Sequence, residues 1–192
     1  MAKKKLKTSD IQKDWDSNPF RKPKIEKVVV NIAVGQAGEE LNKRAKILEL
    51  LTEKKPVILK AKKSVKDFGI RKGQSIAVKV TLRGEIALNF LKRTLFVYDN
   101  RILKSAFDNF GNFSIGIDEH IKMPNVKYIP ELGITGLDVA VRLVRPGYRV
   151  KIRRKQKTKI PKNHYVSKLE SIFFVEKELG TEVVDKMEER FY

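Results

Sequence analysis

Residues 64–84, SVKDFGIRKGQSIAVKVTLRG, combine the residue types that bind phosphate groups. Gly69 and Gly73 allow the backbone to turn sharply or to approach a ligand closely, and positively charged side chains neutralise phosphate. The cations closest to these glycines are Lys66, Arg71 and Lys72. Between positions 54 and 83 the chain has ten basic residues and one acidic residue, whereas an ordinary solvated surface mixes both signs. The pattern predicts a cationic loop on the end of a strand that contacts a nucleic acid.

The charge of the whole chain favours the same kind of partner. Its 192 residues include 42 Lys and Arg against 23 Asp and Glu, which gives a net charge of +19. A surplus of this size repels itself in a compact protein, so it is typical of a chain that binds a polyanion. Nucleic acid is the first candidate, and an anionic membrane surface is the second.

Side chains for catalysis or metal binding are sparse. The chain has no cysteine, which excludes disulfides and thiolate metal sites. His120 and His164 lie far apart, and the adjacent Asp118 and Glu119 would face opposite ways on a strand instead of forming an acid–base pair. No apolar run approaches the ~20 residues that span a bilayer. We therefore expect no enzyme, no cofactor, no metal, no membrane and no small-molecule substrate.

The order of the predicted elements indicates an α+β fold. Residues 1–24 are expected to form an arm with a short helix, residues 25–144 the RNA-binding core domain, and residues 145–192 a basic extension followed by an acidic C-terminal helix. Apolar patterns predict strands at 25–35, 55–62, 76–83, 112–119 and 135–144, with helices at 39–54 and 84–97. We expect a single, mostly antiparallel five-stranded sheet, with helices packed on one face and the other face open to RNA.

Alternation along the strands separates the two faces of the predicted sheet. In 76–83, one side carries apolar residues that would meet the helices, and the other carries Lys79, Thr81 and Arg83. Asn31 interrupts an otherwise apolar strand, so its amide either bonds locally or faces a ligand. The helix at 84–97 is expected to bury Ile86, Phe90, Leu91 and Leu95. RNA is favoured over DNA because no motif for reading the major groove is present.

Two further features leave alternatives open. The basic run after Arg145 could be a solvated tail, a targeting signal or an extension that penetrates RNA, and we favour the extension. Trp15, the only tryptophan, either anchors the N-terminal arm to the body or stacks on a base. The residues expected to touch RNA from the extension are Arg149, Lys151, Arg153, Arg154, Lys155 and Lys157.

Several separated segments resemble one known family. KPVILKAKKSVKDFGIRKGQSIAVKVTLRG, VVVNIAVG, SAFDNFGNFSIGIDEHI and GITGLDVAV resemble the motifs of the universal large-subunit ribosomal protein L5 family. The match extends from about residue 18 to residue 144. The segment RPGYRVKIRRKQKTKIPKNHYV resembles the archaeal and eukaryotic branch of this family.

The resemblance implies a structural constituent of the large ribosomal subunit in the cytoplasm. It implies binding to 5S ribosomal RNA in the central protuberance, beside 23S-type ribosomal RNA and other large-subunit proteins. It also implies contact with the P-site transfer RNA through loop 64–75, and a bridge to a small-subunit head protein. The residues implied for 5S RNA are Asn31, Lys54, Lys60, Lys62, Lys63, Ser64, Lys79, Thr81 and Arg83. Those implied for transfer RNA are Lys66, Phe68, Gly69, Arg71, Lys72 and Gly73.

The chain departs from the family pattern at two positions, and other functions compete with this interpretation. Lys54 stands where glutamine is frequent, and Leu59 stands where threonine is frequent, so Leu59 offers no hydroxyl. An RNA-binding regulator of the RRM type would need paired aromatic residues on its central strands, and 76–83 has none. An RNA-processing enzyme would need an acid–base or metal constellation. A membrane-surface protein would need a basic amphipathic helix.

Overall fold

A computed structural model describes residues 8–35 and 38–185. The basic start of the predicted arm and the last seven residues of the acidic end lie outside this range. The described residues form two compact units. We call residues 27–97 and 115–140 the sheet unit, and residues 8–26, 98–114 and 141–185 the tail unit.

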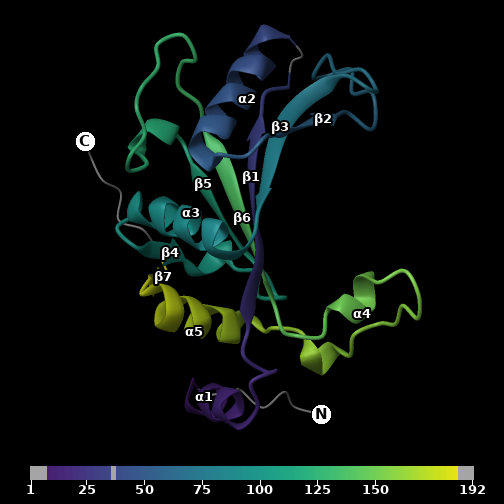
Figure 1. Ribbon diagram of the computed structural model, residues 1–192, viewed down its shortest axis with the longest axis vertical. Coiled ribbons are helices and arrows are strands. Elements are labelled where there is room, and N and C mark those ends of the chain that lie inside the picture. Colours follow the sequence, from purple (N-terminus) through teal and green to yellow (C-terminus); the bar gives the residue numbers. More distant parts are fainter. Residues whose placement is uncertain (1–7, 36–37, 186–192) are drawn as a thin grey trace. The chain divides into compact units, whose positions relative to one another are not determined.

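A five-stranded sheet forms the framework of the fold (Figure 1). Its strands lie in the order β2-β3-β1-β6-β5. They comprise β1 (Lys24–Ala33), β2 (Val57–Lys60), β3 (Ser75–Leu82), β5 (Phe113–Ile117) and β6 (Leu137–Val144). β3 pairs antiparallel with both β1 and β2. The predicted five-stranded α+β fold is therefore confirmed, and the strands lie close to their expected positions.

The strand register separates an apolar row from a polar row. Val30 opposes Val80, and Val28 opposes Leu82, and all four side chains are buried. Asn31, next to Val30 on β1, opposes a lysine and is only half-buried. Because side chains alternate across a strand, the apolar rows face the helices and the polar row faces away from them.

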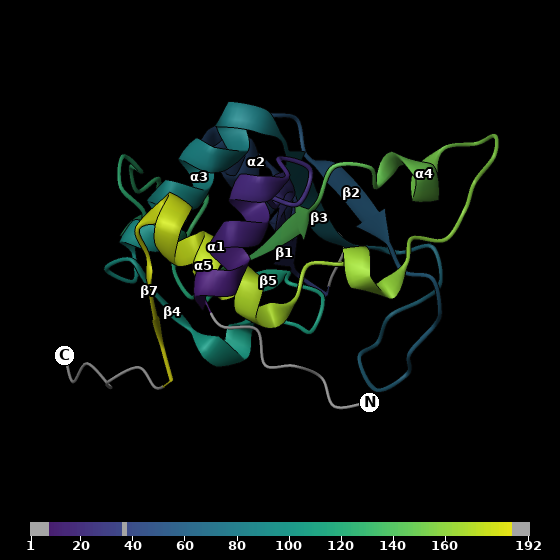
Figure 2. The same ribbon diagram turned by 90° about the horizontal axis from the view of Figure 1, so that it is seen from below.

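Two helices cover the apolar side of the sheet unit: α2 (Glu39–Thr52) and α3 (Gly84–Phe96) lie on the same side (Figure 2). Two glutamates in the first turn of α2 suit the positive end of the helix dipole. Buried Leu48 and Leu51 form part of its inner stripe.

The prediction that one residue of the apolar face of α3 is buried is wrong. Phe90, Leu91 and Leu95 are buried as predicted, but Ile86 is 47% exposed. Ala87 is fully buried in its place. The inner stripe recurs at three- and four-residue spacing from position 87, and position 86 lies about 100° away from it around the helix.

The tail unit contains three helices and a second sheet. The helices are α1 (Thr8–Ser17), α4 (Arg149–Ile152) and α5 (Lys168–Leu179). The second sheet pairs β4 (Arg101–Leu103) with β7 (Glu182–Val184) in parallel. Ser167 and Glu170 form a reciprocal capping box at the start of α5, and Gly180 ends the helix in the left-handed conformation. Short 3-10 turns occur in this unit at Lys104–Ala106 and Lys162–His164, and in the sheet unit at His120–Lys122.

Candidate nucleic-acid interface

The sheet face turned away from α2 and α3 carries a row of predicted site residues, which we call the open face. Asn31 on β1 opposes Lys79 on β3, and Lys79 in turn opposes Val57 on β2. In the next row Thr81 opposes Val29. The side chains of Asn31, Lys79 and Thr81 are half-buried, and none of the three makes a hydrogen bond to another residue within the described parts of the chain. An amide, a hydroxyl and an ammonium group are thus presented together, free to bind sugar and phosphate oxygens.

The other predicted 5S contacts border this face or lie apart from it. Lys60 ends β2, and Arg83 follows β3 directly. Lys62, Lys63 and Ser64 lie in the connection between β2 and β3, and are exposed. Lys54 is half-buried beyond the end of α2. The sheet therefore brings most of these cations to one side, whereas Lys54 does not belong to the open-face rows.

The connection between β2 and β3 is an ordered double turn that we call the tip loop, residues 61–74 (Figure 1). Val65 and Ile70 exchange backbone hydrogen bonds of 2.8 and 3.0 Å. Gly73 donates its N–H to the Ala61 carbonyl. Both glycines have positive φ, +63° at Gly69 and +87° at Gly73, which explains why glycine is needed there.

Side chains complete the hydrogen bonding of the tip loop. The Ser64 hydroxyl accepts the Lys72 N–H at 2.9 Å, and the Gln74 side chain accepts the Arg71 N–H at 2.9 Å. These bonds use the backbone of Arg71 and Lys72, so the cationic groups of both residues remain exposed. Phe68 is 77% exposed beside them. The loop therefore presents charge and one aromatic ring from a fixed backbone, which the sequence pattern alone did not indicate.

The basic run forms a second excursion, which we call the basic loop, residues 146–162. All six cations predicted to contact RNA here are exposed. The ends of the loop are joined, because Arg145 donates to the Asn163 carbonyl at 3.3 Å, and a ring nitrogen of His164 lies 2.9 Å from the Pro146 carbonyl. Within the loop, Thr158 donates its N–H to the Val150 carbonyl. The described chain then continues into α5.

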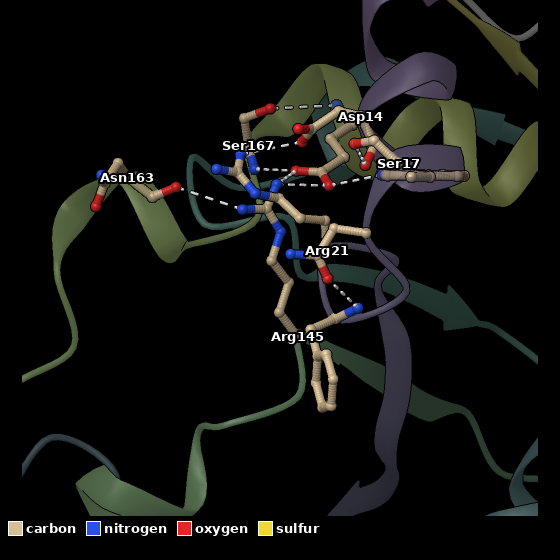
Figure 3. Close-up of polar contacts among 10 residues, drawn as sticks. Asp14, Ser17, Arg21, Arg145, Asn163 and Ser167 are labelled. Atoms are coloured by element: carbon tan, nitrogen blue, oxygen red, sulfur yellow. Dashed lines mark hydrogen bonds and ion pairs between the residues drawn. The ribbon is translucent and has the colours of Figure 1, made fainter.

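A buried ion pair holds this junction (Figure 3). One guanidinium nitrogen of Arg145 lies 2.7 Å from both carboxylate oxygens of Glu170, and both side chains are more than nine-tenths buried. Trp15 donates its indole N–H to the same carboxylate at 3.0 Å. The ring of Trp15 also lies 5.2 Å from that of Phe173. Of the two roles considered for Trp15, the structure supports anchoring of α1 to α5.

The histidines have structural roles. His120 is buried, and its Nδ1 accepts the Thr135 N–H at 3.3 Å. Burial lowers the pKa of His120; the backbone hydrogen bond with Thr135 opposes this effect, and the nearby Arg44 cation lowers the pKa further. Burial also raises the pKa of Tyr148. Within residues 8–35 and 38–185, no three His, Cys, Asp or Glu side chains are grouped as a metal site would require.

Throughout the described part of the chain, no helix combines the length and the apolar character needed to cross a bilayer.

Two functional details escaped the sequence analysis. The Ser64 hydroxyl orders the tip loop, and Arg145 joins the ends of the basic loop. For Arg145 the available signal was its position: it directly follows the apolar strand β6, where an arginine without a partner would be costly. No feature of the sequence indicates this role of Ser64, because only the path of the turn brings the Lys72 N–H to its hydroxyl.

Comparison with known proteins identifies the relatives of this fold. The family model described as ribosomal protein L5 matches residues 18–71, and the model described as the C-terminus of the same ribosomal family matches residues 75–173. The "Large ribosomal subunit protein uL5" of Aeropyrum pernix is 49% identical over 179 residues, covering 93% of each chain. That of Pyrobaculum aerophilum is 51% identical over 166 residues, covering 86% of this chain and 93% of the relative. That of Sulfurisphaera tokodaii is 50% identical over 169 residues, covering 88% and 96%. The chain belongs to the ribosomal protein L5 family.

Proposed function

We propose that this chain, a structural constituent of the large ribosomal subunit and not an enzyme, binds 5S ribosomal RNA through the open face. Asn31 and Thr81 bond sugar and phosphate oxygens, and Lys79 neutralises a phosphate. The cations bordering the face, among them Lys60 and Arg83, extend the contact along the RNA backbone.

The observation that carries this proposal is the row formed by Asn31 and Lys79. Both side chains lie in the middle of a sheet, yet neither has a partner in the described protein. A half-buried amide without a protein partner stays accessible, so it can bond to a ligand that lies on this face. A folded RNA supplies hydroxyl and phosphate oxygens for that purpose, and the family membership makes ribosomal RNA the expected ligand.

The tip loop and the basic loop have separate targets in this proposal. The tip loop contacts the P-site transfer RNA, since a fixed cationic loop that binds phosphates can accept transfer RNAs of any sequence. The basic loop contacts 23S-type ribosomal RNA. The chain attaches 5S RNA within the central protuberance beside other large-subunit proteins, and it bridges to a small-subunit head protein.

The test replaces Asn31 and Thr81 together with alanine and measures binding to a 5S transcript by gel shift. We expect a loss of about thirtyfold to 150-fold, because two hydrogen bonds to charged or hydroxyl oxygens contribute about 1–1.5 kcal/mol each. Neither side chain is bonded within the described protein, so the circular dichroism spectrum and the melting temperature should change little.

The matched control is Asn89→Ala. Asn89 is exposed on α3, the opposite side of the sheet unit. Unchanged 5S affinity of the double variant, or an equal loss in Asn89→Ala, would remove the open face from RNA binding.

A further inference from the structure

The tail unit contains a cavity that the proposed contacts leave unused. It measures about 760 Å³, within the range of about 300–1,000 Å³ typical of small-ligand sites. Its wall comes partly from the basic loop and the residues that follow it, and partly from the turn at 108–112. The cavity lining includes Phe110, Lys151, Lys157, Lys159, Lys162 and Tyr165.

The electrostatics of this cavity favour an anion. Four lysines line it, and no acidic residue does. Of these four lysines, only Lys151 makes a side-chain hydrogen bond within the described residues, a 3.4 Å bond to the Tyr165 hydroxyl. Lys157 and Lys159 are exposed, without ion pairs among the described residues. The ligand that complements this wall carries phosphate or carboxylate charge.

The rings in the cavity favour a flat, aromatic ligand. Phe110 is 59% exposed, although it is a large apolar side chain, and its ring lies 5.7 Å from that of Tyr165 in an edge-to-face arrangement. An edge-to-face partner leaves one face of the Phe110 ring uncovered. A nucleobase can stack on that face, whereas the carboxylates of an acidic peptide cannot.

The turn that carries Phe110 is rigid. The Asp108 carboxylate accepts the N–H groups of Phe110 and Asn112, both at 2.8 Å. Ser171 donates its hydroxyl to the Gly111 carbonyl at 2.6 Å. A Cβ at Gly111 would lie 2.6 Å from Val166, so the turn packs directly against the cavity wall. The backbone that carries the ring is therefore preorganised, which lowers the entropy cost of binding a base there.

We propose that this cavity binds one unpaired nucleotide of ribosomal RNA, with its base stacked on Phe110 and its phosphates on Lys157 and Lys159. The proposal deepens the contact suggested for the basic loop, and it rests on that contact. The cavity would bind a nucleotide of single-stranded RNA and not one within a duplex, because a base within a duplex is stacked and has no free face.

The experiment measures fluorescence anisotropy of the full-length protein with two labelled probes, a single-stranded RNA octamer and a blunt RNA duplex of eight base pairs. We expect Phe110→Ala to weaken octamer binding about tenfold and to leave duplex binding unchanged. Replacing Lys157 and Lys159 with glutamine should weaken both. Among the described residues, Tyr165 is the only aromatic ring that packs against the Phe110 ring, so the variant should fold.

The matched control is Phe96→Ala, which removes a ring of similar exposure, 64%, from α3. Equal losses for octamer and duplex, or no loss in Phe110→Ala, would overturn the nucleotide site. A loss confined to Phe68→Ala would assign the stacking to the tip loop. Tighter binding of a decaglutamate peptide than of the octamer would assign the cavity to a protein partner. Either result would also overturn the nucleotide site. None of these outcomes affects 5S binding by the open face, which is measured with the Asn31 and Thr81 variant.

Discussion

At the scale of single residues, Glu170 is the carboxylate on which the tail unit depends most. It accepts from Arg145 and Trp15, and it closes the capping box of α5 with Ser167. It therefore connects the first helix, the end of the last strand of the large sheet and the last helix of the described chain. Because its partners are buried with it, no solvent replaces these bonds when the carboxylate is removed.

We expect Glu170→Ala to lower the free energy of unfolding by about 3–5 kcal/mol, since it leaves the Arg145 charge buried without a partner. Urea denaturation measures the change. Glu182→Ala is the control, because Glu182 pairs with Arg101 at the surface, where both side chains are more than half exposed. The control should cost at most about 1 kcal/mol. Similar losses in both variants would mean that Arg145 and Glu170 do not act as a buried pair.

His120 makes stability depend on pH. Its pKa in the folded state is lowered from the usual 6.5, mainly by burial, so the unfolded chain binds its proton more readily. Stability is therefore fully present above pH 6.5 and is lost as the pH falls below it. Urea denaturation at pH 7 and pH 5 should show a smaller loss in His120→Gln than in the wild type. Equal losses would show that His120 does not contribute to this pH dependence.

At the scale of elements, the groups that fix the backbone of the tip loop are different from the groups that carry its charge. Its hydrogen bonds use main-chain groups and the side chains of Ser64 and Gln74, so the three cations can be removed without disturbing the turn. We expect the triple variant K66Q/R71Q/K72Q to retain 5S affinity within about threefold in gel shift, and to weaken protection of P-site transfer RNA in footprinting of reconstituted ribosomes. Complete loss of 5S capture in this variant would contradict the division between loop and open face.

The elements that could be predicted were those with a repeating pattern. Alternation in β3 places Val80 in the core and Lys79 on the open face, because a sheet buried on one side enforces that period. Helix periodicity failed only at Ile86, where two adjacent apolar residues compete for one position in the stripe. β4 and β7 escaped prediction because three-residue strands are too short to show alternation, and their pairing joins residues about 80 positions apart.

The candidate site divides in the same way. Residues on an alternating strand, such as Lys79 and Thr81, could be placed by counting along the sequence. Contacts made across a turn or between distant segments could not. The Ser64 bond to Lys72 and the Arg145 bond to Asn163 depend on a backbone path that local residue preferences do not define.

At the scale of the whole molecule, the net charge of +19 is best explained by the partner rather than by the protein. The described ion pairs lie mostly at the surface and contribute little each, so they do not offset the repulsion among the cations. Binding RNA offsets it, because each phosphate that is neutralised releases a counterion. Under the proposed function, the open face and both loops would share this gain while contacting different RNAs.

The most direct measurement is the 5S binding constant as a function of salt, for the wild type and for the Asn31 and Thr81 double-alanine variant. We expect binding to the 5S transcript to exceed binding to a scrambled RNA of equal length. Its logarithm should fall linearly with the logarithm of salt concentration, by about 0.7–0.9 for each phosphate neutralised. The double variant should bind more weakly with the same slope, since it removes no charge. Binding that is insensitive to salt, or that does not distinguish 5S RNA from the scrambled transcript, would contradict recognition of 5S RNA by the open face.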